Sequence, residues 1–282
     1  MKLSQARLAI ILAVLVASTS GCAVINRIRA KNQLNEAARS YRESHFDEAE
    51  QHSRRALELD PTNKTAPLFI ARTIHAQYRP GVTTSDNIAK ANDAIDAYKK
   101  ILAANPKDEE AYKAIAFLYE KLKEDEKLRQ WITARATDER MEPEKRSEAY
   151  VVLASKDWNC SFQITDLPTN KVTTVENNKA AVSYKKPKEQ KDFDKAQMCV
   201  KKGLEEIENA IKFDSNSESA WSYKTNLLLE ASHLAEMDGK MDQKAEWDKQ
   251  REVAQKRTNA LSEINQKKKE AAAQKQASPP SS

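Results

Sequence analysis

Glycine is scarce in this chain, with only four residues among 282. A loop that cradles phosphate through its backbone N–H groups needs several closely spaced glycines, so the sequence excludes the common nucleotide-binding loops. Folds built from many β-hairpins also rely on glycine at their tight turns. A composition this poor in glycine therefore favours helices over hairpin-rich β structure.

Motifs of catalysis and metal binding are absent as well. The sequence contains no GxSxG, HExxH, CxxC or calcium-loop pattern. Its four histidines, His45, His52, His75 and His233, are not spaced with carboxylates as metal ligands would be. We therefore expect no metal site, no bound cofactor and no catalytic residue.

Neither sign of charge dominates the chain. Lysine and arginine number 47 against 42 aspartates and glutamates, both signs are interspersed, and the net charge is +5. Such a balance is not typical of nucleic-acid-binding proteins, so we expect no nucleic-acid partner. The basic run Lys267–Lys269 is short and precedes Glu270. We interpret it as a solvated run, and contact with anionic lipid or cell-wall polymer is the alternative.

The long apolar run of the chain lies at its N-terminus. Leu8–Ala17 follows Lys2 and Arg7 and is too short to cross a bilayer, which is typical of a secretory signal. The next residues, Thr19-Ser20-Gly21-Cys22, resemble the bacterial lipobox, although Thr19 stands where leucine is usual. The resemblance implies a signal peptide over 1–21 and a lipid on Cys22, which opens a lipidated linker over 22–30. An ordinary secretory signal or an uncleaved anchor is the alternative.

The residue after the cysteine bears on localisation. In Gram-negative lipoproteins an aspartate at this position would signal retention in the inner membrane, and Ala23 stands there instead. The resemblance therefore implies an outer-membrane lipoprotein that faces the periplasm. Two further cysteines, Cys160 and Cys199, remain as a pair in a compartment where disulfides persist. We expect a disulfide between them, with two separate buried thiols as the alternative.

A spacing of small residues recurs along the chain. In each occurrence a small residue precedes a second small or aliphatic residue by seven positions, and a helix-stopping residue follows five positions later. This pattern is typical of stacked helix pairs. The occurrences are Ala49, Ala56 and Pro61; Ala94, Ile101 and Pro106; and Gly203, Ala210 and Ser215.

The repeat resembles that of the tetratricopeptide repeat (TPR) family, whose unit is a helix-turn-helix of about 34 residues. The resemblance implies an all-α solenoid of about five TPR-type helix pairs. We place repeat helices over 31–159, with extra residues around Pro80-Gly81, and further repeat helices with a C-terminal capping helix over 192–272. The Lys- and Ala-rich residues 273–282 are predicted to be a disordered tail.

Residues 160–191 interrupt the repeat. Phe162 and Ile164 alternate with polar residues, a turn follows near Asp166-Leu167-Pro168, and Val172–Val175 is rich in β-branched residues. This pattern predicts a small β-hairpin or an irregular loop. The expected disulfide would attach the start of this insertion to the helix that follows it.

In the TPR family, alternate turns of the first helix of each pair line a concave groove that binds extended peptides or partner helices. The matching positions lean basic, so we expect the groove to prefer an acidic or carboxylate-bearing segment. The tryptophans are expected to pack in the core, and Trp158 is the one for which a ligand contact is kept as an alternative. The predicted groove residues are Asn35, Arg39, Arg42, Leu68, Arg72, His75, Lys113, Phe117, Lys121, Val151, Ser155 and Trp158.

These features predict a non-enzymatic, lipid-anchored scaffold. It would bind a protein or peptide partner in an assembly, secretion or cell-wall process of the bacterial envelope, and it would reach the membrane through the lipid on Cys22. The alternative is an enzyme or small-ligand binder with its site in 160–191, where Asn159, Asp166, Asn170 and Tyr184 offer polar groups. The sequence leaves self-association and the oligomeric state open.

Overall fold

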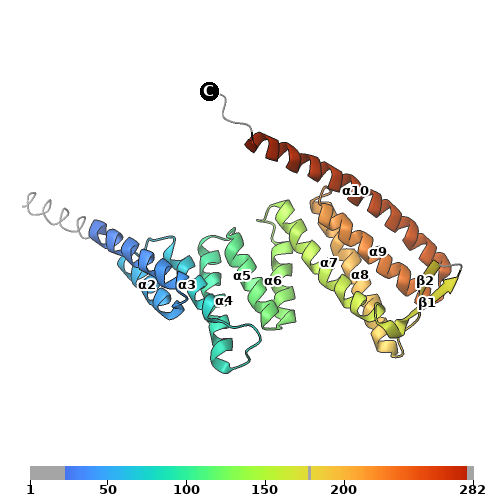
Figure 1. Ribbon diagram of the computed structural model, residues 1–282, viewed down its shortest axis with the longest axis horizontal. Coiled ribbons are helices and arrows are strands. Elements are labelled where there is room, and N and C mark those ends of the chain that lie inside the picture. Colours follow the sequence, from blue (N-terminus) through green and yellow to red (C-terminus); the bar gives the residue numbers. More distant parts are fainter. Residues whose placement is uncertain (1–22, 177–178, 278–282) are drawn as a thin grey trace, which may run out of the picture. The chain divides into compact units, whose positions relative to one another are not determined.

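The computed structural model describes residues 23–176 and 179–277. The predicted signal peptide, Cys22 and residues 278–282 of the predicted tail lie outside the described residues. The chain divides into two compact units, of which the first ends at Leu128 and the second begins at Arg129. Figure 1 shows both units with their helices labelled.

The first unit is a series of helices in which each packs against the next. An N-terminal helix over residues 23–42 precedes α2 (Phe46–Leu59), α3 (Ala66–Gln77), α4 (Ser85–Ala104) and α5 (Glu109–Lys121) (Figure 1). Small side chains let these helices approach one another. Ala30, Ala56 and Ala66 are completely buried and pack together, with Leu34, Leu57 and Leu59 around them.

Local signals set the helix ends in this unit. Thr84 and Asp108 are the N-caps of α4 and α5, and their side chains accept hydrogen bonds from the backbone N–H groups of Asn87 and Ala111. Pro61 and Pro106 follow the C-caps of α2 and α4. Since proline cannot continue a helix, each pair is separated from the next at the predicted place.

The second unit contains four long helices and a β-hairpin. The boundary between the units falls within α6 (Asp125–Thr137), which α7 (Pro143–Thr165), α8 (Gln190–Phe213), α9 (Glu218–Met237) and α10 (Met241–Ala277) follow. Helices α7, α8 and α9 pack on one another, and α10 packs along α9 (Figure 1). Within the described residues helices make up almost all of the regular structure and the two strands of the hairpin are the exception, so the predicted all-α fold is confirmed.

The β-hairpin connects α7 to α8. A short 3-10 turn, η1 (Pro168–Asn170), leads into β1 (Lys171–Glu176), which pairs antiparallel with β2 (Lys179–Tyr184), so that Val172 lies opposite Ser183. The predicted hairpin is thus confirmed for the β-branched run Val172–Val175.

The predicted start of the insertion is wrong. Helix α7 continues to Thr165, so Cys160, Phe162 and Ile164 are helical rather than extended. The helix continues because Asp157, Ser161 and Thr165, four residues apart, are all buried and form one row on its inner face. The alternation of Phe162 and Ile164 with polar residues is a short coincidence within this helical pattern.

Three other segment boundaries in the structure also differ from the predicted ones. Residues 23–30, predicted as a linker, are helical. Helix α8 starts at Gln190, and α10 continues to Ala277, so residues 273–277 of the predicted tail are helical too. These segments are rich in Ala, Lys, Gln and Arg, which are good helix formers, and short extensions of a helix cost little.

Candidate partner-binding surface

The first unit brings predicted groove residues from α3 and α5 together. The Arg72 guanidinium on α3 donates two hydrogen bonds to the Glu110 carboxylate on α5. The hydrogen bonding of Arg72 to the Glu110 carboxylate raises the pKa of Arg72. Both side chains remain partly exposed. The pair therefore lies on an accessible surface where a second carboxylate could compete with Glu110 for the guanidinium.

An aromatic cluster continues this surface. The His75 ring lies 5.9 Å from Tyr98 and 5.6 Å from Phe117, measured between ring centroids. His75 Nδ1 and the Tyr98 hydroxyl oxygen are 3.4 Å apart. Burial lowers the pKa of His75, so its imidazole is neutral at pH 7. Lys121 Nζ lies 5.1 Å from the centroid of the Phe117 ring. Phe117 nevertheless remains 41% exposed, so part of this ring is open to a ligand.

The other predicted positions of this unit contribute charge and polarity. Asn35, Arg42 and Lys113 are exposed, and Leu68 is half-buried. Arg39 is exposed but pairs with Glu36 at 2.5 Å. Because Arg39 and Arg72 already have carboxylate partners, the positive character of this surface depends mainly on Arg42 and Lys113. The surface is consequently less basic than the count of its arginines suggests.

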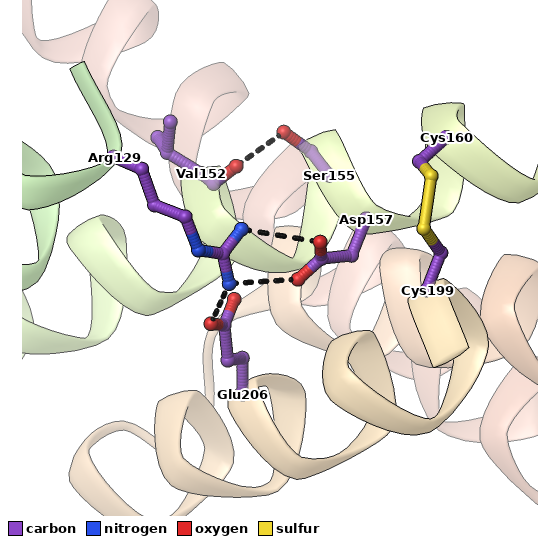
Figure 2. Close-up of polar contacts among 7 residues, drawn as sticks. All are labelled: Arg129, Val152, Ser155, Asp157, Cys160, Cys199 and Glu206. Atoms are coloured by element: carbon purple, nitrogen blue, oxygen red, sulfur yellow. Dashed lines mark hydrogen bonds and ion pairs between the residues drawn. A yellow bond between two sulfur atoms is a disulfide. The ribbon is translucent and has the colours of Figure 1, made fainter. Parts of the chain in front are cut away.

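The predicted positions of the second unit are differently placed. Val151 is only 7% exposed and belongs to the core between α7, α8 and α9, so it cannot line a groove. The Ser155 hydroxyl donates to its own helix at Val152 O, over 2.8 Å (Figure 2). Trp158 stacks on Phe162 with 5.0 Å between centroids and meets Tyr223 edge-on. These contacts give Trp158 a packing role.

Beside these residues lies an ion-pair cluster that the repeat pattern does not reveal. Arg129 of α6 donates two hydrogen bonds to Asp157 of α7 and a third to Glu206 of α8 (Figure 2). Two carboxylates thus share one guanidinium in a largely buried place. Burial and the neighbouring Asp157 charge raise the pKa of Glu206 to about 7, against the attraction of Arg129. The cluster cross-links three helices, which is a structural role.

The predicted disulfide is confirmed. Cys160 and Cys199 are bonded, with 6.1 Å between their Cα atoms (Figure 2). Because Cys160 is still within α7, the bond joins the C-terminal part of α7 to the middle of α8 instead of holding the start of the insertion. Its effect on the hairpin is therefore indirect.

The polar residues of the predicted insertion each have a local structural role. The Asp166 carboxylate accepts a hydrogen bond from Lys171, and Asn170 donates to Ile164 O over 2.8 Å. The Tyr184 ring stacks on His233 with 3.7 Å between centroids. Asn159 is exposed on α7. These contacts hold the hairpin against α7 and α9 and do not direct the four residues to one common point.

The extra residues around Pro80 form one wall of a cavity in the first unit. Asn87 fastens this loop, since its side chain accepts from Arg79 N and donates to Arg79 O and Val82 O, each over 2.8 Å. The cavity has a volume of about 820 Å³ and opens to solvent. It lies between the start of α2, the end of α3 and the start of α4, with His45, Gln77 and Lys90 among its lining residues.

No group of three or more His, Cys, Asp or Glu residues is placed to hold a metal ion in residues 23–176 and 179–277. Within the same ranges, no helix is both long and apolar enough to cross a membrane.

No family model and no curated protein matches the sequence. Solved structures with a related fold include MamA, at TM-score 0.39 and 15% identity, over 82% of this chain and 94% of that chain. YrrB, described as a TPR protein with an unusual peptide-binding site, matches at TM-score 0.36 and 12% identity, over 83% of this chain and 90% of that chain. A tetratricopeptide repeat protein from Parabacteroides merdae matches at TM-score 0.34 and 12% identity, over 83% of this chain and 98% of that chain.

At such identities and TM-scores these similarities carry no argument about function. The fold follows from the chain itself. Consecutive helix pairs pack through small residues at the repeated positions Ala49, Ala56, Ala94 and Ala210, all completely buried. The protein therefore has a fold of the tetratricopeptide-repeat type, interrupted by the Pro80 loop and by one β-hairpin.

Proposed function

We propose that the protein is a non-enzymatic scaffold that holds a protein or peptide partner on the surface formed by α3 and α5. We further propose that a lipid on Cys22 attaches it to the periplasmic face of the bacterial outer membrane, in an assembly, secretion or cell-wall process. One observation carries the first part. Arg72, His75 and Phe117, which lie on two helices, meet on one accessible surface of a helix-pair fold.

The chemistry of this surface favours a particular kind of segment. The exposed Phe117 ring can pack against an apolar or aromatic side chain, and the adjacent Arg72 can exchange Glu110 for a carboxylate of the ligand. Stacked helix pairs present extended surfaces suited to such segments. We therefore propose an extended peptide that carries an apolar residue next to an acidic one.

Two features support the proposed location. The lipobox-like Thr19–Cys22 lies after an apolar leader, and the disulfide between Cys160 and Cys199 suits an oxidising compartment such as the periplasm. Attachment at the membrane would concentrate the scaffold near its partner, and the α3–α5 surface would supply selectivity.

Crosslinking in the native envelope tests the partner-binding surface. We expect Phe117→Ala combined with Lys113→Glu to reduce partner capture about tenfold or more, as for loss of an interface hot spot. The matched control combines Val253→Ala and Lys256→Glu, which change an exposed apolar and an exposed basic residue of α10. Equal capture by the α3–α5 variant and the wild type, with the partner identified, would place the binding site elsewhere.

Mass spectrometry of the N-terminal fragment tests the anchor separately. We expect Cys22 to carry acyl chains and to be the first residue, and Cys22→Ser to release the protein from the outer membrane without altering partner contacts in solution. An unmodified Cys22 preceded by the intact leader would contradict the lipid anchor. It would leave the binding surface to be judged by crosslinking alone.

A further inference from the structure

The N-terminal helix presents an exposed apolar patch at its start. Val24, Ile25 and Ile28 are 56%, 51% and 58% exposed. At 100° per residue these three side chains share one face of the helix. The opposite face at Ala30 is buried against Ala56 and Ala66, so the patch points away from the core of the unit.

In the described part of the chain, the buried positions of this helix begin only after the patch. Ala30 is the first buried residue of the described chain, and residues 23–29 precede it by almost two turns, or about 10 Å. The apolar side chains are thus on a projecting end of the helix. Burying three branched aliphatic side chains would be favourable, so a contiguous patch of this kind is a candidate contact surface.

Basic residues flank the patch on both sides. On the helical wheel, Arg27 and Lys31 stand beside Val24, and Arg29 stands beside Ile25, all three exposed. Further along the same face the exposed residues are Asn32, Asn35 and Arg39, so the apolar character is confined to the projecting end. An apolar stripe with cationic borders is typical of a helix that lies in the interface of an anionic membrane.

The position of the patch in the chain also indicates that a membrane covers it. Cys22 directly precedes the described helix, so the Cα atom of Ile28 lies within about 12 Å of the Cα atom of Cys22. The side chains of an interfacial helix enter a bilayer by about 5–10 Å. If the lipid on Cys22 is inserted in the bilayer, residues 23–28 lie within reach of the headgroup region.

We propose that residues 23–29 form a second membrane contact, in which Val24, Ile25 and Ile28 enter the interface of an anionic phospholipid bilayer and Arg27, Arg29 and Lys31 bind its headgroups. This inference rests on the proposed lipid anchor for its location, while the contact itself is made by the side chains of the helix. The consequence is a fixed orientation of the first helix pair at the membrane instead of free rotation about a lipid tether.

Lipid-borne quenching of a fluorophore at residue 28 tests the contact. The full-length protein, processed in its host and purified with its own N-terminus, carries Ile28→Cys and a polarity-sensitive label. It is reconstituted in vesicles of phosphatidylcholine with or without phosphatidylglycerol that contain a nitroxide lipid. Asn35→Cys, on the same face two turns further along, is the matched control. We expect several-fold stronger quenching at residue 28 than at residue 35, and stronger quenching with phosphatidylglycerol.

Two variants separate the two parts of the contact. Val24→Ser with Ile25→Ser should reduce quenching at residue 28 in both kinds of vesicle. Arg27→Gln, Arg29→Gln and Lys31→Gln together should remove only the added effect of phosphatidylglycerol. Equal quenching at residues 28 and 35 would overturn the inference, and so would a label that is shielded by envelope proteins but not by lipid, since the patch would then be a protein-docking surface.

The state of Cys22 is determined on the same samples, so the two proposals fail in different ways. If Cys22 is acylated and residue 28 stays in water, the membrane contact is refuted and the anchor stands. If Cys22 is unmodified, the label is introduced in a Cys22→Ser background. Quenching at residue 28 then decides the membrane contact without the lipid.

Discussion

At the scale of single residues, Gly203 shows how closely the helices of the second unit approach. A Cβ atom added at this position would lie 2.6 Å from Leu227 Cδ2 of α9 and 3.2 Å from Asp157 Cβ of α7. Leu227 is completely buried, so its side chain would have to shift against its neighbours to admit the added atom. The crossing of α7, α8 and α9 therefore favours glycine at this position.

Gly203→Ala should consequently destabilise the protein although alanine is the better helix former. Overpacking costs about 1–3 kcal/mol, while the gain in helix propensity is about 1 kcal/mol. We expect a lower urea midpoint, corresponding to a net loss of up to about 2 kcal/mol in the free energy of unfolding. In the Leu227→Ala background the added methyl group should cost less, because space is available. A more stable Gly203→Ala single variant would refute the close packing.

Glu206 should make the stability of the second unit depend on pH. Its pKa is raised to about 7 in the folded protein, from an ordinary value of 4.5. The folded state therefore binds the proton more tightly, and the stabilisation from this group is fully present below about pH 4.5 and lost as the pH rises towards 7. Glu206→Gln, which mimics the protonated form, should remove this part of the pH dependence in urea titrations between pH 4.5 and 8. Asp242→Asn, an exposed carboxylate of α10, is the control. Parallel pH profiles for wild type and Glu206→Gln would contradict the raised pKa.

At the scale of elements, contacts with α7 and α9 hold the β-hairpin in place. Tyr184 stacks on His233, and its backbone N–H donates to Glu236 over 3.0 Å. Behind the hairpin, the buried Glu230 carboxylate accepts hydrogen bonds from Ser161 and Thr165. None of these contacts involves the disulfide. The attachment of the hairpin to α7 and α9 therefore does not depend directly on the bond between Cys160 and Cys199.

Removing the disulfide should thus weaken the helix packing without releasing the hairpin. The bond closes a loop with a sequence separation of 39 residues. The chain-entropy estimate for such a loop is about 4 kcal/mol, and measured losses are often smaller. We expect Cys160→Ser with Cys199→Ser to lower the melting temperature, while hydrogen exchange at the strand amides of Lys171–Val175 stays slow. Fast exchange there in the double variant would show that the hairpin depends on the disulfide.

The loop after α3 offers a second test at this scale. Asn87→Asp keeps the acceptor for Arg79 N but loses the two hydrogen bonds donated to Arg79 O and Val82 O. We expect a cost of about 1–3 kcal/mol and faster amide exchange in residues 79–84. Asn63→Asp is the matched control, since only the Oδ1 acceptor of Asn63 is used, by Thr65 N and Ala66 N. Equal effects of the two substitutions would contradict the role of the Asn87 amide group.

At the scale of the whole molecule, the chain consists of two units with separate cores. In repeat proteins each pair is stabilised mainly by its immediate neighbours. We therefore expect Gly203→Ala to accelerate amide exchange in α7, α8 and α9 but to leave α3, α4 and α5 unchanged. Partner capture on the α3–α5 surface should be unaffected for the same reason. Equal acceleration in both units, measured by hydrogen exchange with mass spectrometry, would show that they unfold as one.

Local patterns of the sequence predicted the helix pairs and the hairpin strand Val172–Val175, while the pairing of Cys160 with Cys199 was expected because these two cysteines remain once Cys22 is assigned to the lipid. Helical periodicity, helix-stopping prolines and β-branched runs act over a few residues, so they can be read without the fold. The extension of α7 to Thr165 could not be read in this way, because it depends on burial of Ser161 and Thr165 against Glu230.

Only the tertiary structure decided which groove residues meet and how their charges are used. Arg72 contacts Glu110, which is 38 positions away in the sequence, and Arg129 contacts Glu206, which is 77 positions away. The burial of Val151 and the exposure of Val24, Ile25 and Ile28 likewise depend on which helices lie beside them. The repeat pattern records only spacing along the chain, so it indicates the packed small residues but not the charge pairs or the burial of residues outside the repeated positions, which depend on through-space neighbours.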